Sequence, residues 1–225
     1  MRILTDTKIT ASMLTVQTES NAFPKENMIN NVLNEKTLVT TYFDVDFGSA
    51  LTIDSIGLLA EGSGWTVTAG ASLGASTFSQ AISDTVTFIG QTWRYWRFTT
   101  SAPDYMEYVY LGEYLQIPQI VPGSTPQPTA TDVKNRTSGG QVYPTQGTIV
   151  KMQDVTAIGL TATEFETINT WYYSSDRVNN HIVVPFESSM TVYPFEPYFA
   201  EISGYGSFKR DVLAYDIKFK LEEAK

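Results

Sequence analysis

The only histidine of the chain, His181, is the first residue to consider for acid–base chemistry. It precedes an Ile-Val-Val run at 182–184 that predicts a strand. A Ser–His–acid triad would depend on His181, and the one Gly-x-Ser-x-Gly string, at 70–74, lies in a small polar loop with no helix predicted after it. The absence of cysteine excludes thiolate nucleophiles, thiolate metal sites and disulfides. We therefore expect a structural His181, no catalytic residue and a chain that is not an enzyme.

Three aspartates could gather around a calcium ion, because Ca²⁺ takes several oxygen ligands. Asp44 and Asp46 share one face of an alternating pattern, and Asp54 follows in the next run. Their spacing matches no EF-hand loop and exposed strand carboxylates are common, so we predict no metal and no cofactor. A pair of carboxylates for glycoside hydrolysis stays open, since the separation it needs is spatial.

The densest group of aromatic and basic residues is the run Trp93-Arg94-Tyr95-Trp96-Arg97-Phe98. One interpretation is a platform on which a sugar ring stacks, and replacing Trp65 or Trp93 by alanine would then abolish binding. The other is a core strand, with tryptophan inside and arginine reaching the edge. Sugar platforms usually lie on loops, so the pattern favours the core strand.

The elements before residue 118 are predicted to be short strands. In 41–47, Phe43, Val45 and Phe47 alternate with polar residues, a Gly-Ser turn follows, and 51–60 is a second, apolar strand. Further strands are expected at 65–69, 85–89, 93–98 and 107–117, and a short helix at 25–33. In the last strand Tyr108, Tyr110 and Tyr114 should share one face. Many short strands separated by Gly and Ser/Thr indicate a β-sandwich over residues 1–117.

The prolines at 118, 122, 126 and 128 predict an extended linker or arm over 118–135. The module at 136–225 should combine one helix near 161–175 with an antiparallel sheet. Thr161 and Glu164 have the spacing of a capping box at the start of that helix. In the final strand, 212–221, apolar residues alternate with Asp216, Lys218 and Lys220. The predicted fold class is mainly β, a sandwich followed by a small α+β module.

The composition limits the classes of molecule that the chain could bind. The net charge is −9 and no basic cluster occurs, which argues against nucleic acid and against anionic membrane surfaces. No run approaches the ~20 apolar residues of a membrane span, and no signal-peptide core is visible at the N-terminus. Only 17% of residues are charged while 13 are tyrosine, which fits strand faces that meet proteins or sugars.

The order of several N-terminal segments resembles the discoidin (F5/8 type C) jelly-roll sandwich. The segments are Asp44-Val45-Asp46-Phe47-Gly48, Leu51–Leu59, Trp93–Phe98 and Val109–Ile117. Many discoidin modules bind sugars or lipids through loop tips, and the resemblance therefore implies a carbohydrate-binding role as an alternative function. The loop at 70–81 is small and polar, and the cysteine pair of the family is missing.

A broader resemblance is to structural proteins of long-tailed bacteriophage tails, at the tail tip or baseplate. It is carried by Trp93–Phe98, Val109–Glu113, the arm Arg136-Thr137-Ser138-Gly139-Gly140-Gln141-Val142-Tyr143 and the following module to Leu221. It implies a non-enzymatic virion protein, assembled in the host cytoplasm from repeated copies, such as a ring, and from other tail proteins. A glycan would be a further partner. The expected interaction residues are Tyr108, Tyr110, Tyr114, Arg136, Gln141 and Tyr143.

Overall fold

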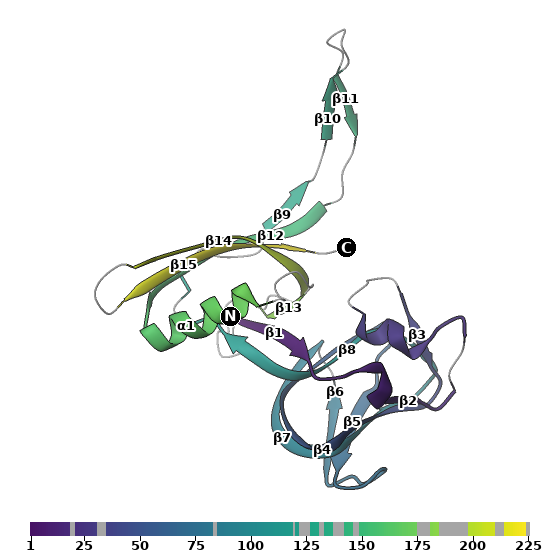
Figure 1. Cartoon of the computed structure of the whole chain (residues 1–225). Coiled ribbons are helices and arrows are strands. Elements are labelled where there is room, and N and C mark those ends of the chain that lie inside the picture. Colours follow the sequence, from purple (N-terminus) through teal and green to yellow (C-terminus); the bar gives the residue numbers. More distant parts are fainter. Residues whose placement is uncertain are drawn as a thin grey trace. The chain divides into compact units, whose positions relative to one another are not determined.

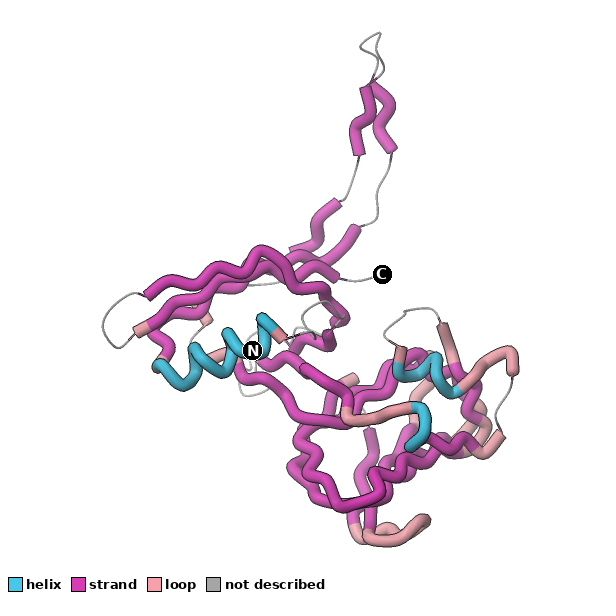
Figure 2. The backbone as a smooth tube through the Cα atoms, viewed as in Figure 1, coloured by secondary structure: helices cyan, strands magenta, loops and turns pink. Residues whose placement is uncertain are grey.

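The computed structural model describes residues 1–18, 21–30, 35–82, 85–118, 120–121, 127–130, 133–136, 142–145, 149–174, 181–184, 198–209 and 214–223 (Figure 1). Strands dominate these residues and one α-helix accompanies them, which confirms the predicted mainly β class (Figure 2). The chain divides into two compact units, Ile3–Leu115 and Met1–Arg2 with Gln116–Lys225.

The N-terminal unit is an antiparallel β-sandwich. Its sheet order is β6-β5-β7-β4-β8-β1, with β2 paired to β4 and β3 paired to β8. Its elements are β1 (Arg2–Thr7), η1 (Ala11–Met13), β2 (Leu14–Val16), η2 (Lys25–Ile29), β3 (Thr37–Val39), β4 (Tyr42–Ala60), β5 (Trp65–Gly70), β6 (Phe78–Ile82), β7 (Val86–Thr100) and β8 (Asp104–Gln116). The helix expected at 25–33 is the short 3₁₀ helix η2, which starts directly after Pro24.

Strands β4 and β7 are long and bent, and each contributes to both layers of the sandwich. Residues 42–46 of β4 pair with 95–99 of β7, and after a break in register 51–57 pair with 86–93. The second part of β4 also pairs with β8. The sequence predicted two strands and a turn at Gly48, and this is wrong because Gly48, at φ 74°, bends one continuous strand. The segments at 85–89 and 93–98 likewise belong to one strand, with Gly90 at φ 64°.

The core of this unit lies between the two layers. Phe43 and Val45 are fully buried, as the alternation in 41–47 predicted, and Phe47 packs partly against them. The Phe43 ring stacks on Phe98 of β7 with centroids 4.7 Å apart and planes 5° apart. Burial of these large apolar side chains is the main stabilising contribution to the unit.

The tyrosines of β8 are not an exposed face. Tyr108 and Tyr110 are only 5% and 1% exposed, because β8 is buried continuously over residues 108–112. Tyr110 uses its hydroxyl to donate to the Glu113 carbonyl. Tyr114 is half-buried and packs edge-on against Phe88. Tyr108 and Tyr110 are therefore buried where an open strand face was expected, and the interaction role of the three tyrosines stays a prediction.

The C-terminal unit is an antiparallel sheet in the order β13-β14-β15-β12-β9, with helix α1 packed on it. Its elements are β9 (Gln127–Ala130), β10 (Val133–Arg136), β11 (Val142–Thr145), β12 (Ile149–Leu160), α1 (Ala162–Tyr173), β13 (His181–Val184), β14 (Tyr198–Lys209) and β15 (Tyr215–Glu223). Part of the expected linker is therefore strand: β9 pairs with β12, and β10 pairs with β11 in a separate two-stranded sheet. Pro128 lies in β9 at the edge of the sheet, where its missing N–H costs little.

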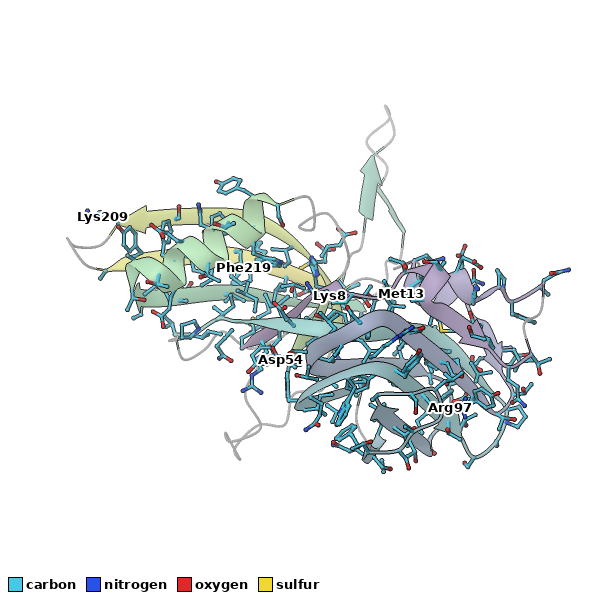
Figure 3. All side chains as sticks on the ribbon, turned by 60° about the horizontal axis from the view of Figure 1, so that its bottom comes forward. Lys8, Met13, Asp54, Arg97, Lys209 and Phe219 are labelled. Atoms are coloured by element: carbon cyan, nitrogen blue, oxygen red, sulfur yellow. The ribbon has the colours of Figure 1, made fainter. Side chains whose placement is uncertain are left out.

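Helix α1 begins with the predicted capping box. The Thr161 hydroxyl accepts from the Glu164 backbone N–H, and the Glu164 carboxylate accepts from the Thr161 backbone N–H. The helix packs on β15, where Phe165 stacks on Tyr215 at 4.4 Å and the buried Phe219 follows along the strand (Figure 3). Asp216, expected on the polar face of this strand, is buried and accepts a hydrogen bond from the Gly159 backbone N–H. None of the helices in the described residues could cross a membrane.

Candidate functional site

His181 lies inside the C-terminal unit, as the sequence predicted. Its side chain is 2% exposed, and its ring meets the Trp171 ring edge-on with centroids 5.5 Å apart. His181 is therefore part of the packing of this unit.

The aspartates considered for calcium are engaged by arginines instead. Asp44 receives two hydrogen bonds from Arg97, at 2.7 and 2.8 Å, and Asp46 receives two from Arg94, at 2.8 and 3.0 Å. These paired contacts use both oxygens of each carboxylate. Among the residues that the structure describes, no three acidic or histidine side chains gather as metal ligands, and Asp54 joins no such group.

Asp46 also fixes the bend in β4. Its Oδ1 atom accepts the Gly48 backbone N–H at 2.7 Å as well as the Arg94 hydrogen bond. The hydrogen bond from Arg94 holds the pKa of Asp46 below its ordinary value. Asp46 therefore joins β7 to the bulge at Gly48.

The run at 93–98 divides between the core and the outer surface. Trp96 and Phe98 are buried, which confirms the core-strand interpretation, while Trp93 packs partly against the same core. Arg97 lies over the Tyr42 ring at 4.0 Å from its centroid, and Arg94 lies over Tyr95 at 4.5 Å. The run therefore does not present a row of exposed tryptophan rings on which a sugar could stack.

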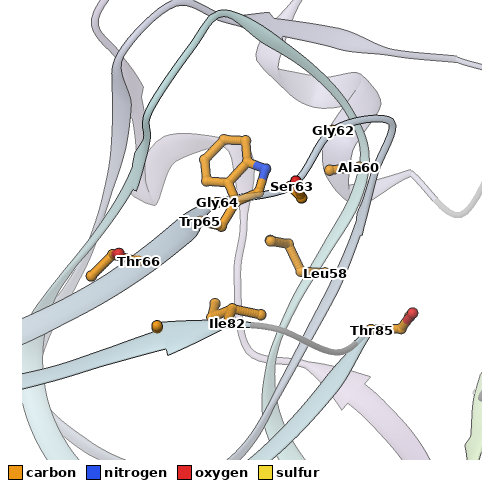
Figure 4. Close-up of a pocket in the computed structure, with 10 residues that line it drawn as sticks. Leu58, Ala60, Gly62, Ser63, Gly64, Trp65, Thr66, Ile82 and Thr85 are labelled. Carbon is orange, nitrogen blue, oxygen red and sulfur yellow. The ribbon is translucent and has the colours of Figure 1, made fainter.

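A pocket of about 500 Å³ opens at one end of the N-terminal sandwich (Figure 4). Its walls come from the end of β4, the turn at 61–64, the start of β5, the end of β6 and the residue before β7. Leu58, Trp65 and Ile82 form the apolar wall. The remaining lining residues are small or carry hydroxyls: Ala60, Gly62, Ser63, Gly64, Thr66, Ala81 and Thr85.

Buried Asp104 holds the turn that forms this pocket. Its carboxylate accepts from the Trp65 indole N–H, the Gly62 backbone N–H and the Tyr105 backbone N–H, each at 2.8 Å. A Cβ atom on Gly62 would lie 2.8 Å from Asp104 Oδ2, so the close approach of turn and carboxylate requires glycine. Asp104 is 8% exposed and does not line the pocket, so its carboxylate interacts with donors of the protein itself.

The pocket combines an apolar wall with hydroxyl groups, and none of its lining residues is charged. Among the described residues, no hydrogen bond uses the side-chain hydroxyls of Ser63, Thr66 or Thr85. The sequence singled out Trp65 of this site and none of its neighbours. The local signal was the Gly-Ser-Gly-Trp turn, but the contributions of β6 and of Thr85 follow only from the sheet order.

The expected interaction residues are divided between the two units, with Tyr108, Tyr110 and Tyr114 on β8 of the N-terminal unit. Arg136 and Tyr143 lie on β10 and β11, where the register pairs Arg136 with Val142 and Asn135 with Tyr143. Gln141 lies outside the described residues. The role of these residues, and of Tyr114, in assembly stays a prediction.

A tyrosine cluster on the C-terminal unit was not predicted from the sequence. Tyr172 of α1 stacks on Tyr205 of β14 at 4.0 Å, and Tyr173 meets both rings edge-on. Burial, followed by the neighbouring tyrosines, raises the pKa of Tyr205 to about 12, so its hydroxyl stays protonated at neutral pH.

Replacing Asp104 by asparagine should destabilise the N-terminal unit. The amide has one acceptor oxygen, so it cannot satisfy both the Trp65 and the Gly62 donors. We expect the free energy of unfolding, measured with urea, to fall by about 1–3 kcal/mol. Asp154→Asn, whose side chain is 82% exposed, should change it by less than about 0.5 kcal/mol. Equal stability of the two variants would contradict the role assigned to Asp104.

Removing the Arg94 guanidinium should raise the pKa of Asp46. A carboxyl with a depressed pKa stabilises the fold above its unfolded-state pKa and loses that contribution as pH falls through the folded-state pKa. Carboxyl NMR titration of Arg94→Gln should therefore show Asp46 protonating at higher pH than in the unmodified chain. Lys36→Gln is the control, because Lys36 pairs with Glu61 and Glu107. An unchanged Asp46 titration in Arg94→Gln would refute the assigned cause.

No protein-family model and no curated protein matches this chain. Solved structures with partial likeness include chitosan-binding module 1 of a chitosanase/glucanase from Paenibacillus sp. IK-5, with a TM-score of 0.36 and 12% identity over 44% of this chain and 93% of the module. The module CpGH89CBM32-6 from Clostridium perfringens gives 0.37 and 13% over 44% and 91%. The CBM32 of AlyQ in complex with 4,5-unsaturated mannuronic acid gives 0.38 and 20% over 49% and 97%.

Proposed function

We propose that this chain is a carbohydrate-binding protein without catalytic activity, and that its N-terminal unit holds a neutral saccharide in the pocket at the end of the sandwich. The observation that carries the proposal is the lining of that pocket. It joins an apolar wall to three hydroxyl side chains and contains no charged residue.

The size of the pocket suits a small ring. Ligand pockets range over roughly 300–1,000 Å³, and this one is about 500 Å³. A pyranose presents C–H groups on its faces and hydroxyls around its rim. Leu58 and Ile82 offer apolar contact to the C–H faces of the ring. Ser63, Thr66 and Thr85 offer hydrogen bonds to its hydroxyls.

Because the lining of the pocket contains no charged residue, it favours neutral ligands over charged ones. A phosphate or carboxylate group that entered the pocket would lose its hydration shell, and no cationic side chain of the lining would compensate that loss. An ammonium group would likewise find no anionic side chain in the lining. The Asp104 carboxylate is close but already accepts three hydrogen bonds. A neutral saccharide therefore loses the least solvation on entry.

A glycan array followed by calorimetry tests this function. Among the neutral glycans, the array should yield at least one binder, whose affinity calorimetry then measures. Ser63→Trp places an indole at the mouth of the pocket and should weaken that affinity by at least about tenfold, or 1.4 kcal/mol. Ser63 is exposed, so the substitution leaves the core intact.

The matched control is Ser72→Trp. Ser72 is an exposed serine in the turn at the other end of β5 and does not line the pocket, so affinity should stay within about twofold of the unmodified chain. A glycan that binds both variants equally well would place the site elsewhere. No binding to any glycan of the array would overturn the function.

A second candidate function is a structural subunit of a phage tail, located in the virion. The observation in its favour is the β10–β11 ribbon, which pairs only with itself among the described strands and lies in the part of the chain where the resemblance implies an assembly arm. Light scattering of the full chain mixed with tail-tube or hub protein should then show a stable complex that is lost when 131–147 are replaced by a Gly/Ser linker. A mixture in which the chain keeps its own mass would contradict this function.

A further inference from the structure

Strand β6 forms one edge of the N-terminal sheet. Among the described strands it pairs only with β5, and its other side is open. In an antiparallel sheet about half of the backbone N–H and C=O groups of an edge strand point to that open side. Such a row of unused donors and acceptors is a template on which another strand can pair.

The features that usually protect an edge strand are missing from β6. Its sequence Phe78-Ser79-Gln80-Ala81-Ile82 has no proline and no charged residue. Its register with β5 runs from Trp65↔Ile82 to Ala69↔Phe78 without a bulge. Exposed edges normally carry at least one of these devices against pairing, so a regular and uncharged β6 is open to a partner strand.

The lack of charge around β6 indicates which kind of strand can pair with it. The whole stretch 62–83 contains no charged residue, in a chain whose net charge is −9. The net charge opposes the approach of two copies, but two β6 strands can pair without like charges of this stretch facing each other. We propose that β6 pairs antiparallel with β6 of a second copy of this chain, and that the two sheets join into one across a two-fold axis.

The pattern of burial fixes the register of this pairing. Ser79 and Ala81 are exposed, whereas Phe78 and Gln80 are half-buried and Ile82 is buried. An axis through Gln80 pairs all five residues and keeps the buried side of one strand beside the buried side of the other. Phe78 then faces Ile82 of the second copy, and Ser79 faces Ala81.

This register makes a prediction that charge substitutions can test. In the double variant Ser79→Glu/Ala81→Glu, each glutamate faces a glutamate of the second copy, and the dimer should weaken by at least about tenfold. In Ser79→Glu/Ala81→Lys, each glutamate faces a lysine, and dimerisation should return to within about threefold of the unmodified chain. Both variants change only exposed positions, of which Ala81 also lines the pocket, so circular dichroism should show both folded.

Sedimentation velocity of the full chain over a concentration series measures the dimer. The proposal requires an unmodified chain that dimerises, a Glu/Glu variant that sediments as monomer at concentrations where the unmodified chain does not, and a Glu/Lys variant that dimerises again. An unmodified chain that stays monomeric up to its solubility limit would overturn it and leave the edge to a strand of another protein. Equal dimerisation of the two double variants would overturn it as well. Glycan binding plays no part in this readout, so its outcome is independent of the proposed function.

Discussion

The pairing of β4 with β7 is the constraint on which the N-terminal unit depends. The two strands stay in contact on both sides of the bend, so each layer of the sandwich is covalently continuous with the other. A regular strand could not turn this corner, because its hydrogen bonds and side-chain alternation would carry it straight on. Gly48 supplies the positive φ angle at the bend, and Gly90 supplies one at the second register shift between the two strands, opposite 53–55.

Two aspartates hold the backbone of this unit in place through hydrogen bonds. Asp46 binds the Gly48 N–H and the Arg94 guanidinium, so the bulge in β4 is tied to the strand beside it. Asp104 does the same at the end of the sandwich, where it ties the turn at Gly62 and the Trp65 indole to the start of β8. In both places a carboxylate uses several acceptor sites on donors from different segments. The walls of the pocket are therefore held in place by the protein itself, which would lower the entropic cost of the proposed binding.

The uncharged stretch 62–83 connects the two proposals made for this unit. It supplies the turn, β5 and β6, and so forms much of the pocket as well as the open edge. The charged residues of the unit are gathered elsewhere, in pairs such as Asp44 with Arg97 and Lys36 with Glu107. A neutral surface of this kind favours neutral ligands and self-association, because neither needs a compensating charge.

Local patterns in the sequence determined the mainly β class, the buried face of 41–47, the capped helix at 162–173 and the packing role of Trp96 and His181. Each of these depends on neighbours within a few residues, where the period of two or 3.6 and the capping spacing act directly. Only the tertiary structure decided that Gly48 bends a strand instead of ending it, that Tyr108 and Tyr110 are buried, and that residues from β4, β5 and β6 meet in one pocket. These outcomes depend on which strands pair and on what covers each face, and both are set by contacts between residues far apart in the chain.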